Sequence, residues 1–264
     1  MRLTCALFLA ALPFAFGAVA PNQQADVVQT SKGPLKLMPI YHGSVMLEFG
    51  GKIIHVDPWS QADYTALPQA DLILISHAHA DHMDPPLLKT LRKQSTLVVA
   101  SPAISDTLNG VAGEIETIDN GEKKTFMGIE IEAVPMYNLV FGSGPGKLFH
   151  HKGIGNGYIL SFGDTRVYFS GDTECIPEIK ALKNISVAFL AMNPPRTMPP
   201  AEAAACAKAF PVSLPGAEHA GVCGRAEEYA GSRGAAPQAG RRALTGSAGL
   251  DALGLQDRSD LRPR

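Results

Sequence analysis

Short apolar runs alternate with polar and turn residues along most of the chain, the pattern of a β-rich protein. Gly50-Gly51 separates two such runs and predicts a tight hairpin turn. Residues 71–76 are almost continuously apolar, which indicates a strand buried on both faces. The predicted strands are 35–41, 44–49, 52–56, 71–76, 97–100, 114–118, 125–126, 129–135, 157–162, 166–170 and 187–192.

Three segments between these strands have helical patterns, at 85–93, 177–182 and 200–210. Asp84 is a candidate N-cap for the first helix, and Pro85 suits its first turn. Since neither a repeat nor a low-complexity linker divides residues 35–210, we expect one domain there. Its pattern predicts two packed sheets with helices outside them.

Composition narrows the class of protein only a little. The chain has 264 residues, of which 45% are hydrophobic and 18% charged, as in a globular protein with a core. Its net charge of −2 argues against nucleic acid as a partner, because phosphate binding needs clustered positive charge. Cys175 and Cys206 are the cysteines of the predicted domain, and the sequence allows either a disulfide or two free thiols.

The N-terminus resembles a secretory signal peptide. Arg2 precedes an apolar run at 3–16, and the small residues Gly17, Ala18 and Ala20 follow it. The run is shorter than the roughly 20 apolar residues of a membrane-spanning helix, so we expect no stable membrane span. We therefore interpret residues 1–20 as a signal and the protein as exported, periplasmic or secreted.

The strongest chemical signal is the segment Ser76-His77-Ala78-His79-Ala80-Asp81-His82, directly after the buried strand. Imidazole nitrogens and carboxylate oxygens are ligands for zinc and similar ions. Alternation places His77 and His79 on one side of an extended segment, so both can reach one ion. Asp81 and His82, past a bend, can reach a second. A solvated polar loop or a metal-scavenging histidine tract is the alternative, but the ordered elements predicted on both sides argue against it.

This H-x-H-x-D-H pattern resembles the signature of the metallo-β-lactamase superfamily. Asp57-Pro58-Trp59 and Gly171-Asp172-Thr173 resemble two further motifs of these proteins, and segments 41–44, 135–138 and 191–194 look like the branch of ascorbate-6-phosphate lactonases. The resemblance covers about residues 35–210. It implies an α+β fold, a four-layered αβ/βα sandwich with the metal site at one edge between the sheets.

The resemblance also implies a ligand set. His77 and His79 would hold the first ion, Asp81 and His82 the second, and Asp172 would bridge them. The third histidine of the first site should follow the strand 129–135, where this chain has Asn138, a poor zinc ligand.

Several other residues have more than one interpretation. His150, on the next loop, could supply the nitrogen that Asn138 lacks, or it could be an ordinary solvated or hydrogen-bonded histidine. We expect His42 and Asn193 to lie in the pocket and donate to a developing oxyanion, although both could equally be structural hydrogen-bond partners. Asp57 is expected to brace the metal loops. Residues 142–146 suggest a mobile loop near the mouth of the site.

For a parent protein with an intact C-terminal region, these residues imply a hydrolase in which a hydroxide bridges two metal ions and attacks a lactone, ester or phosphoester of a small molecule. Asp81 would orient the hydroxide. Zinc is the expected ion, and manganese suits a site with more oxygen ligands. The alternative is a non-catalytic or degenerate metal-binding protein that keeps the fold but is inactivated by a lesion in its C-terminal region.

The region after Phe210 has a different composition. Residues before it contain twelve lysines and four arginines, whereas 211–264 contain seven arginines and no lysine, isoleucine, phenylalanine or methionine. Codons that fit 211–217 can spell Pro-Tyr-His-Tyr when read from each second base, which resembles the motif carrying the last metal-binding histidine of this branch. The shifted frame then allows a helix, a strand and a stop. We therefore interpret 211–264 as an aberrant, frameshifted, disordered tail that leaves the C-terminal layer incomplete, and His219 within it as accidental.

Overall fold

The computed structural model describes residues 25–111, 113–209 and 222–223. The predicted signal segment at 1–20 and nearly all of the 211–264 tail, with His219, lie outside the described residues. The frameshift therefore stays a prediction.

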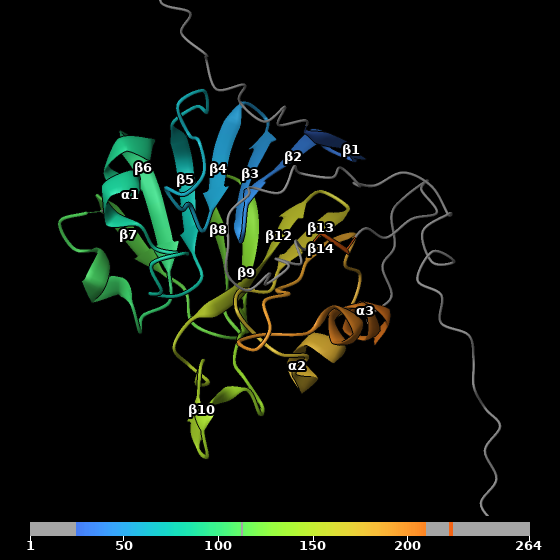
Figure 1. The fold of residues 1–264 in the computed structure, drawn as a ribbon. Coiled ribbons are helices and arrows are strands. Elements are labelled where there is room, and N and C mark those ends of the chain that lie inside the picture. The colour runs from blue at the N-terminus through green and yellow to red at the C-terminus, as the bar shows by residue number, and fades with distance from the viewer. Residues whose placement is uncertain (1–24, 112, 210–221, 224–264) are drawn as a thin grey trace, which may run out of the picture.

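The first sheet has seven strands that follow one another in chain order (Figure 1). They are β1 (Asp26–Thr30), β2 (Gly33–Tyr41), β3 (Ser44–Phe49), β4 (Lys52–Val56), β5 (Ala70–Ile75), β6 (Arg92–Ala100) and β7 (Glu114–Thr117). Strands β1 to β4 pair antiparallel, and β4 to β7 pair parallel. The loops after β4 and β5 consequently leave the sheet at the same edge.

The second sheet has the order β15-β14-β13-β12-β9-β8. Its strands are β8 (Lys123–Phe126), β9 (Ile129–Pro135), β12 (Asn156–Phe162), β13 (Thr165–Phe169), β14 (Val187–Phe189) and β15 (Val222–Cys223). A separate two-stranded hairpin, β10 (Gly142–Gly144) and β11 (Lys147–Leu148), projects from the body between β9 and β12 (Figure 1).

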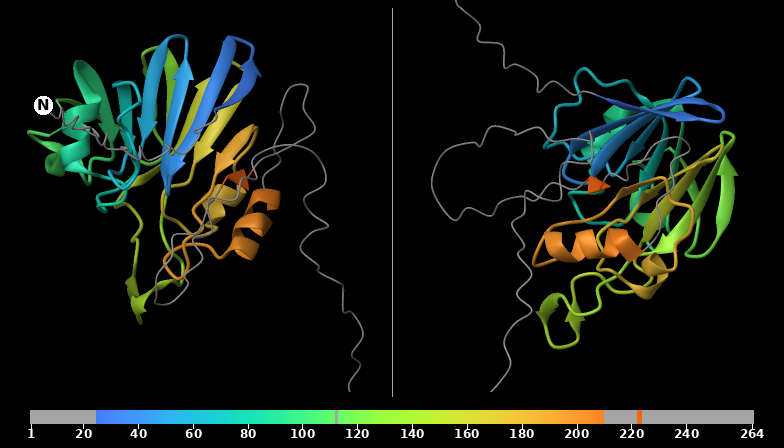
Figure 2. Two further views of the ribbon diagram at one scale, coloured as in Figure 1. Left: turned by 45° about the horizontal axis from the view of Figure 1, so that its top comes forward. Right: turned by 90° about the vertical axis from the view of Figure 1, so that its right-hand side faces the viewer.

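Helices cover the outer faces of both sheets, so the described chain has four layers (Figure 2). Helix α1 (Pro85–Leu91) packs on the first sheet, and α2 (Pro177–Lys180) and α3 (Pro200–Ala209) pack on the second. The central core lies between the sheets, where Leu47 and Leu74 of the first belong to one buried cluster with Leu160 of the second. The predicted α+β sandwich is confirmed. Among the described residues, no helix is long and apolar enough to cross a membrane.

Local signals in the sequence explain several elements. Gly50 and Gly51, with φ of 55° and 74°, form the predicted turn between β3 and β4. The Asp84 side chain caps α1 by accepting from the Leu87 amide at 3.1 Å. This helix ends at Leu91 rather than residue 93, because β6 begins at Arg92.

Four strands were not predicted. No local pattern indicated β1, a half-polar edge strand that depends on pairing with β2. Residues 142–146, expected to be a loop, contribute to the β10/β11 hairpin. Within the region after Phe210, where no strand was expected, β15 pairs with Phe189 and Ala188 of β14.

A disulfide joins Cys175, just before α2, to Cys206 in α3, with an S–S distance of 2.01 Å. It settles the choice that the sequence left open. Both cysteines belong to the buried cluster under these helices. The bond therefore links α3 to the segment before α2, across 31 residues of chain.

We expect reduction of this disulfide to lower the free energy of unfolding by about 3–4 kcal/mol, the loop-entropy value for such a span. Urea titrations with and without dithiothreitol measure the difference. The Cys175→Ala/Cys206→Ala double variant is the control and should not respond to the reductant. Equal stability of the oxidised and the fully reduced wild type would contradict the prediction.

Candidate metal centre

The buried carboxylate of Asp57 organises the histidine-rich loop. Asp57 follows β4, is 3% exposed, and accepts from the Ser76 amide at 2.7 Å and the Ser76 hydroxyl at 2.6 Å. Its Oδ2 also lies 2.8 Å from His82 Nδ1. Asp57 therefore braces both ends of the motif, as expected from the sequence, and directs His82 Nε2 away from itself.

Contacts between the two sheets bring the motif beside the loops of the second sheet. The Tyr158 hydroxyl donates to Ile75 O at 2.7 Å, and the Asn156 amide donates to Ser76 O at 2.9 Å. Gly171 has φ of 59°, and a Cβ there would lie 2.8 Å from Met136 Sδ and 3.2 Å from Ser76 Cβ at the start of the motif. A glycine before Asp172 thus lets the end of β13 approach the motif closely.

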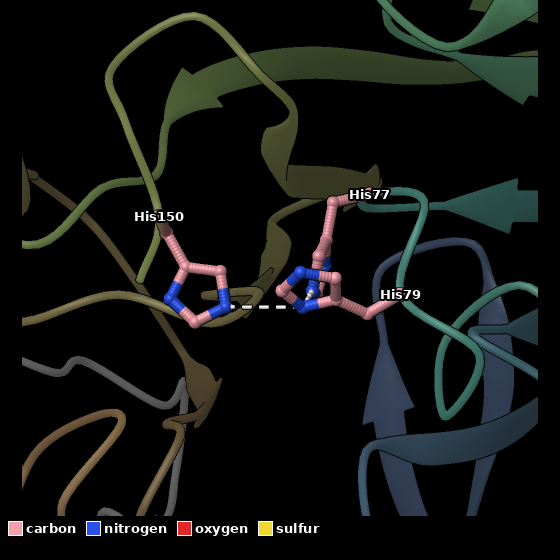
Figure 3. A group of neighbouring side chains, drawn as sticks. All are labelled: His77, His79 and His150. Atoms are coloured by element: carbon pink, nitrogen blue, oxygen red, sulfur yellow. Dashed lines mark hydrogen bonds between the residues drawn. The ribbon is translucent and has the colours of Figure 1, made fainter. Parts of the chain in front are cut away.

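Three imidazoles converge in the first candidate set, which consists of His77, His79 and His150 (Figure 3). His79 Nδ1 lies 2.9 Å from His77 Nε2 and 3.3 Å from His150 Nε2. The potential ligand atoms all lie within 4.8 Å of one another. The structure thus brings His150 to the place that the sequence analysis left uncertain, and three nitrogens of this kind suit zinc.

Asn138 holds His150 and takes no place in this set. Its Oδ1 accepts from the His150 amide at 2.8 Å and lies 2.7 Å from His150 Nδ1. Its amide nitrogen donates to Glu174 Oε1 at 3.1 Å and to Arg196 O at 2.8 Å. Because the Asn138 oxygen can only accept, it fixes the proton of His150 on Nδ1 and leaves Nε2 with its lone pair.

Glu174 is a residue that the sequence analysis missed. Its buried carboxylate accepts from Asn138 and from the amides of Val140 and Phe141. Glu174 therefore fixes the start of the segment 138–150, which ends at His150. Its position two residues after Asp172 was the only sequence signal, and nothing there distinguished it from an ordinary surface acid.

The potential ligand atoms of His82 and Asp172 also lie within 4.8 Å of one another and of one on His77. We define the second candidate set as His82 with the two carboxylates that its Nε2 faces, Asp81 and Asp172. His82 Nε2 lies 3.5 Å from Asp172 Oδ1 and 3.9 Å from Asp81 Oδ2. The other oxygen of Asp172, Oδ2, lies 3.5 Å from His150 Nε2. Asp172 thus faces both sets, which is the arrangement a bridging carboxylate needs.

Burial and neighbouring charges shift the pKa values of the histidines in the two candidate sets in opposite directions. Burial lowers the pKa of His77 well below its usual value and that of His150 to about 4, so both are neutral at pH 7. Burial acts in the same direction on His82, but Asp172, Asp57 and Asp81 overcome it and raise the His82 pKa to about 9. Burial would raise the pKa of Asp81, yet His42 and His82 hold it far below its usual range.

These observations fit a divalent cation. His82 Nε2 is buried and has no hydrogen-bond partner among the described residues, although it is aimed at two carboxylates. An isolated buried polar atom of this kind is costly unless a proton or metal ion satisfies it. The three carboxylates that raise the pKa of His82 would likewise stabilise a cation bound beside it.

The two residues expected to donate to an oxyanion have different surroundings. His42 lies in the site, with Nε2 3.2 Å from Asp81 Oδ2 and its ring 5.5 Å from that of Trp59. Asn193 closes a turn: its amide donates to the Thr197 hydroxyl at 2.7 Å, and its carbonyl accepts from the Thr197 amide. Among the described contacts, none joins Asn193 to the candidate ligands.

Comparison with known proteins agrees with this geometry. Residues 37–213 match the beta-lactamase superfamily domain. The chain is similar to a UPF0173 metal-dependent hydrolase of Thermococcus kodakarensis, with 30% identity over 180 residues that cover 64% of this chain and 77% of the relative. A solved structure from Parabacteroides distasonis, described as a metal-dependent hydrolase, is 41% identical with a TM-score of 0.65, covering 72% of this chain and 84% of that one. Igni18, a metallo hydrolase of Ignicoccus hospitalis, shares the fold at 24% identity and a TM-score of 0.55, covering 66% and 78%.

Replacement of Asn138 tests its role in holding His150. We expect Asn138→Ala to weaken zinc binding at the first set by roughly 10- to 100-fold, the usual loss when a ligand histidine loses its hydrogen-bond partner. Isothermal titration calorimetry measures the affinity, with Asn109→Ala, at an exposed asparagine outside the site, as control. An unchanged zinc affinity in Asn138→Ala would show that His150 needs no such support.

Proposed function

The chain belongs to the beta-lactamase superfamily, and on this premise we propose that it is a metal-dependent hydrolase with two divalent ions, zinc by preference. The proposal rests on the position of Asp172 between the two candidate sets. Its Oδ1 lies 3.5 Å from His82 Nε2, and its Oδ2 lies 3.5 Å from His150 Nε2. A carboxylate placed in this way can hold two ions close together, as two-metal hydrolases require.

Each ligand has a distinct role in this proposal. His77, His79 and His150 would hold the first ion, Asp81 and His82 would hold the second, and Asp172 would contact both. When bound, the ions supply a hydroxide nucleophile near neutral pH and counter the negative charge that develops on a carbonyl or phosphoryl oxygen.

The remaining groups orient the reaction. The Asp81 side chain is one quarter exposed, and its low pKa keeps it ionised, so it can accept a hydrogen bond from an attacking water or hydroxide and orient it. Asp57 and Asn138 fix the rings of His82 and His150, so that little reorganisation is needed when the substrate arrives.

The proposed substrate is a small molecule with a lactone, ester or phosphoester bond. The resemblance of segments 41–44, 135–138 and 191–194 to ascorbate-6-phosphate lactonases favours these over a β-lactam. The non-catalytic alternative rested on Asn138 at a ligand position and on the aberrant C-terminal tail. The location of His150 argues against the first of these grounds, and the second lies outside the described residues. Manganese remains a candidate because the second set is rich in oxygen.

We also propose that the protein is exported, as its N-terminal segment suggests. The Cys175–Cys206 disulfide supports this proposal, because structural disulfides persist mainly in oxidising compartments.

Metal removal and restoration test the function. The chelator-treated protein should hydrolyse none of three probes, a γ-lactone, p-nitrophenyl acetate and bis-p-nitrophenyl phosphate, and zinc or manganese should restore hydrolysis of at least one. Asp172→Asn and His79→Ala should each lower kcat/KM on the order of a hundredfold or more, since each removes a ligand.

The exposed residues Asp106 and His151 provide matched controls, and Asp106→Asn and His151→Ala should retain activity. Metal-loaded wild type that hydrolyses no probe, or chelated protein that remains fully active, would refute the proposed function.

A further inference from the structure

The backbone at His42 has an unusual conformation that places its ring in the site. His42 and Gly43 form the two-residue turn between β2 and β3, where Tyr41 pairs with Ser44. His42 has φ of 51°, a left-handed value that this turn position normally fills with glycine. Strained residues of this kind are concentrated at functional sites, so the conformation itself directs attention to the His42 side chain.

The turn formed by His42 and Gly43 packs closely against His82 of the second candidate set. A Cβ on Gly43 would lie 2.9 Å from His82 Cε1, so the close approach to the His82 ring depends on glycine. The centroid of the His42 ring lies 5.7 Å from that of His82 and 5.5 Å from that of Trp59, with both rings edge-on to it. The His42 ring is therefore held between a neighbouring aromatic ring and the metal-site histidine.

The potential ligand atoms of His42, Asp81 and His82 all lie within 4.8 Å of one another. Asp81 Oδ2 lies 3.2 Å from His42 Nε2 and 3.9 Å from His82 Nε2. Ligands about 2.0–2.1 Å from a tetrahedral zinc are about 3.3–3.4 Å from one another. Asp81 Oδ2 already lies close to this spacing from His42 Nε2, and a small shift would bring it to the same spacing from His82 Nε2.

His82 provides an independent observation. It is 2% exposed, and its Nε2 has no hydrogen-bond partner among the described residues while facing Asp81 and Asp172. An ion that satisfied this nitrogen and Asp81 Oδ2 would lie beside His42 Nε2.

We propose that His42 is itself a ligand of the second ion and completes a set of two imidazoles and two carboxylates with Asp81, His82 and Asp172. This rests on the proposed two-ion function and replaces the earlier expectation that His42 donates to an oxyanion. It also assigns to a β-hairpin turn near the N-terminal end of the domain a ligand that the resemblance expects from the C-terminal region.

Cobalt binding to the full chain tests the proposal without any substrate. Metal-free wild type should bind two equivalents of Co²⁺, followed by visible absorption and by elemental analysis after dialysis. His42→Gly and His42→Ala should retain one equivalent, with the affinity for the second lowered on the order of a hundredfold and its absorption band lost.

Folding does not limit this test, because glycine suits the left-handed position at residue 42; thermal unfolding of metal-free His42→Gly should be no lower than that of wild type. His151→Ala controls for removal of a histidine outside the set. His219→Ala controls for the other candidate, which lies outside the described residues. Both should bind two equivalents as wild type does.

Two equivalents with unchanged affinity in His42→Gly would overturn the proposal, as would a second equivalent that depends on His219 or a wild type that binds fewer than two. The outcome is separable from the proposed function. Loss of the second ion in His42→Gly, together with inactivity of the loaded wild type on all probes, would support the ligand assignment and refute the hydrolase.

Discussion

The buried carboxylate of Asp57 is the constraint on which the site depends. It lies at the end of β4 and accepts three hydrogen bonds from Ser76 and His82, which belong to the loop after the neighbouring parallel strand. A buried carboxylate is stable only when it is paired in this way, and removing its partners typically costs about 3–5 kcal/mol. One interaction therefore fixes the end of the first sheet, the course of the histidine loop and the direction of the His82 ring.

The site divides into two halves with different electrostatics. His77 and His150 are neutral at pH 7 because burial lowers their pKa values, so that half offers nitrogen lone pairs without charge. The other half places His82 among Asp57, Asp81 and Asp172, which raises its pKa to about 9. Asp172 lies between the halves. This distribution suits two cations, one bound mainly by imidazole and one bound mainly by carboxylate, and leaves Asp81 ionised beside them.

Much of this could be predicted from the sequence, because strands with buried faces and a histidine-rich loop leave strong local signals. The run at 71–76, the Gly50-Gly51 turn and the Asp84 cap all correspond to observed elements. The role of Asn138 could not be predicted, since it depends on a contact with His150 twelve residues away across a hairpin. Glu174 was missed because it is defined by partners more than thirty residues away in the chain. Strand β1 pairs with the next strand, β2, and was missed because its half-polar sequence has no distinctive local pattern.

The central claim is that this edge of the sandwich holds two ions, one on each side of Asp172. Anomalous X-ray diffraction at the zinc absorption edge, on crystals grown with zinc, tests it most directly. We expect two peaks, one within the His77, His79 and His150 set and one within the set formed by Asp81 and His82, with Asp172 adjoining both. A single peak, or peaks bound by other residues, would contradict the two-ion account.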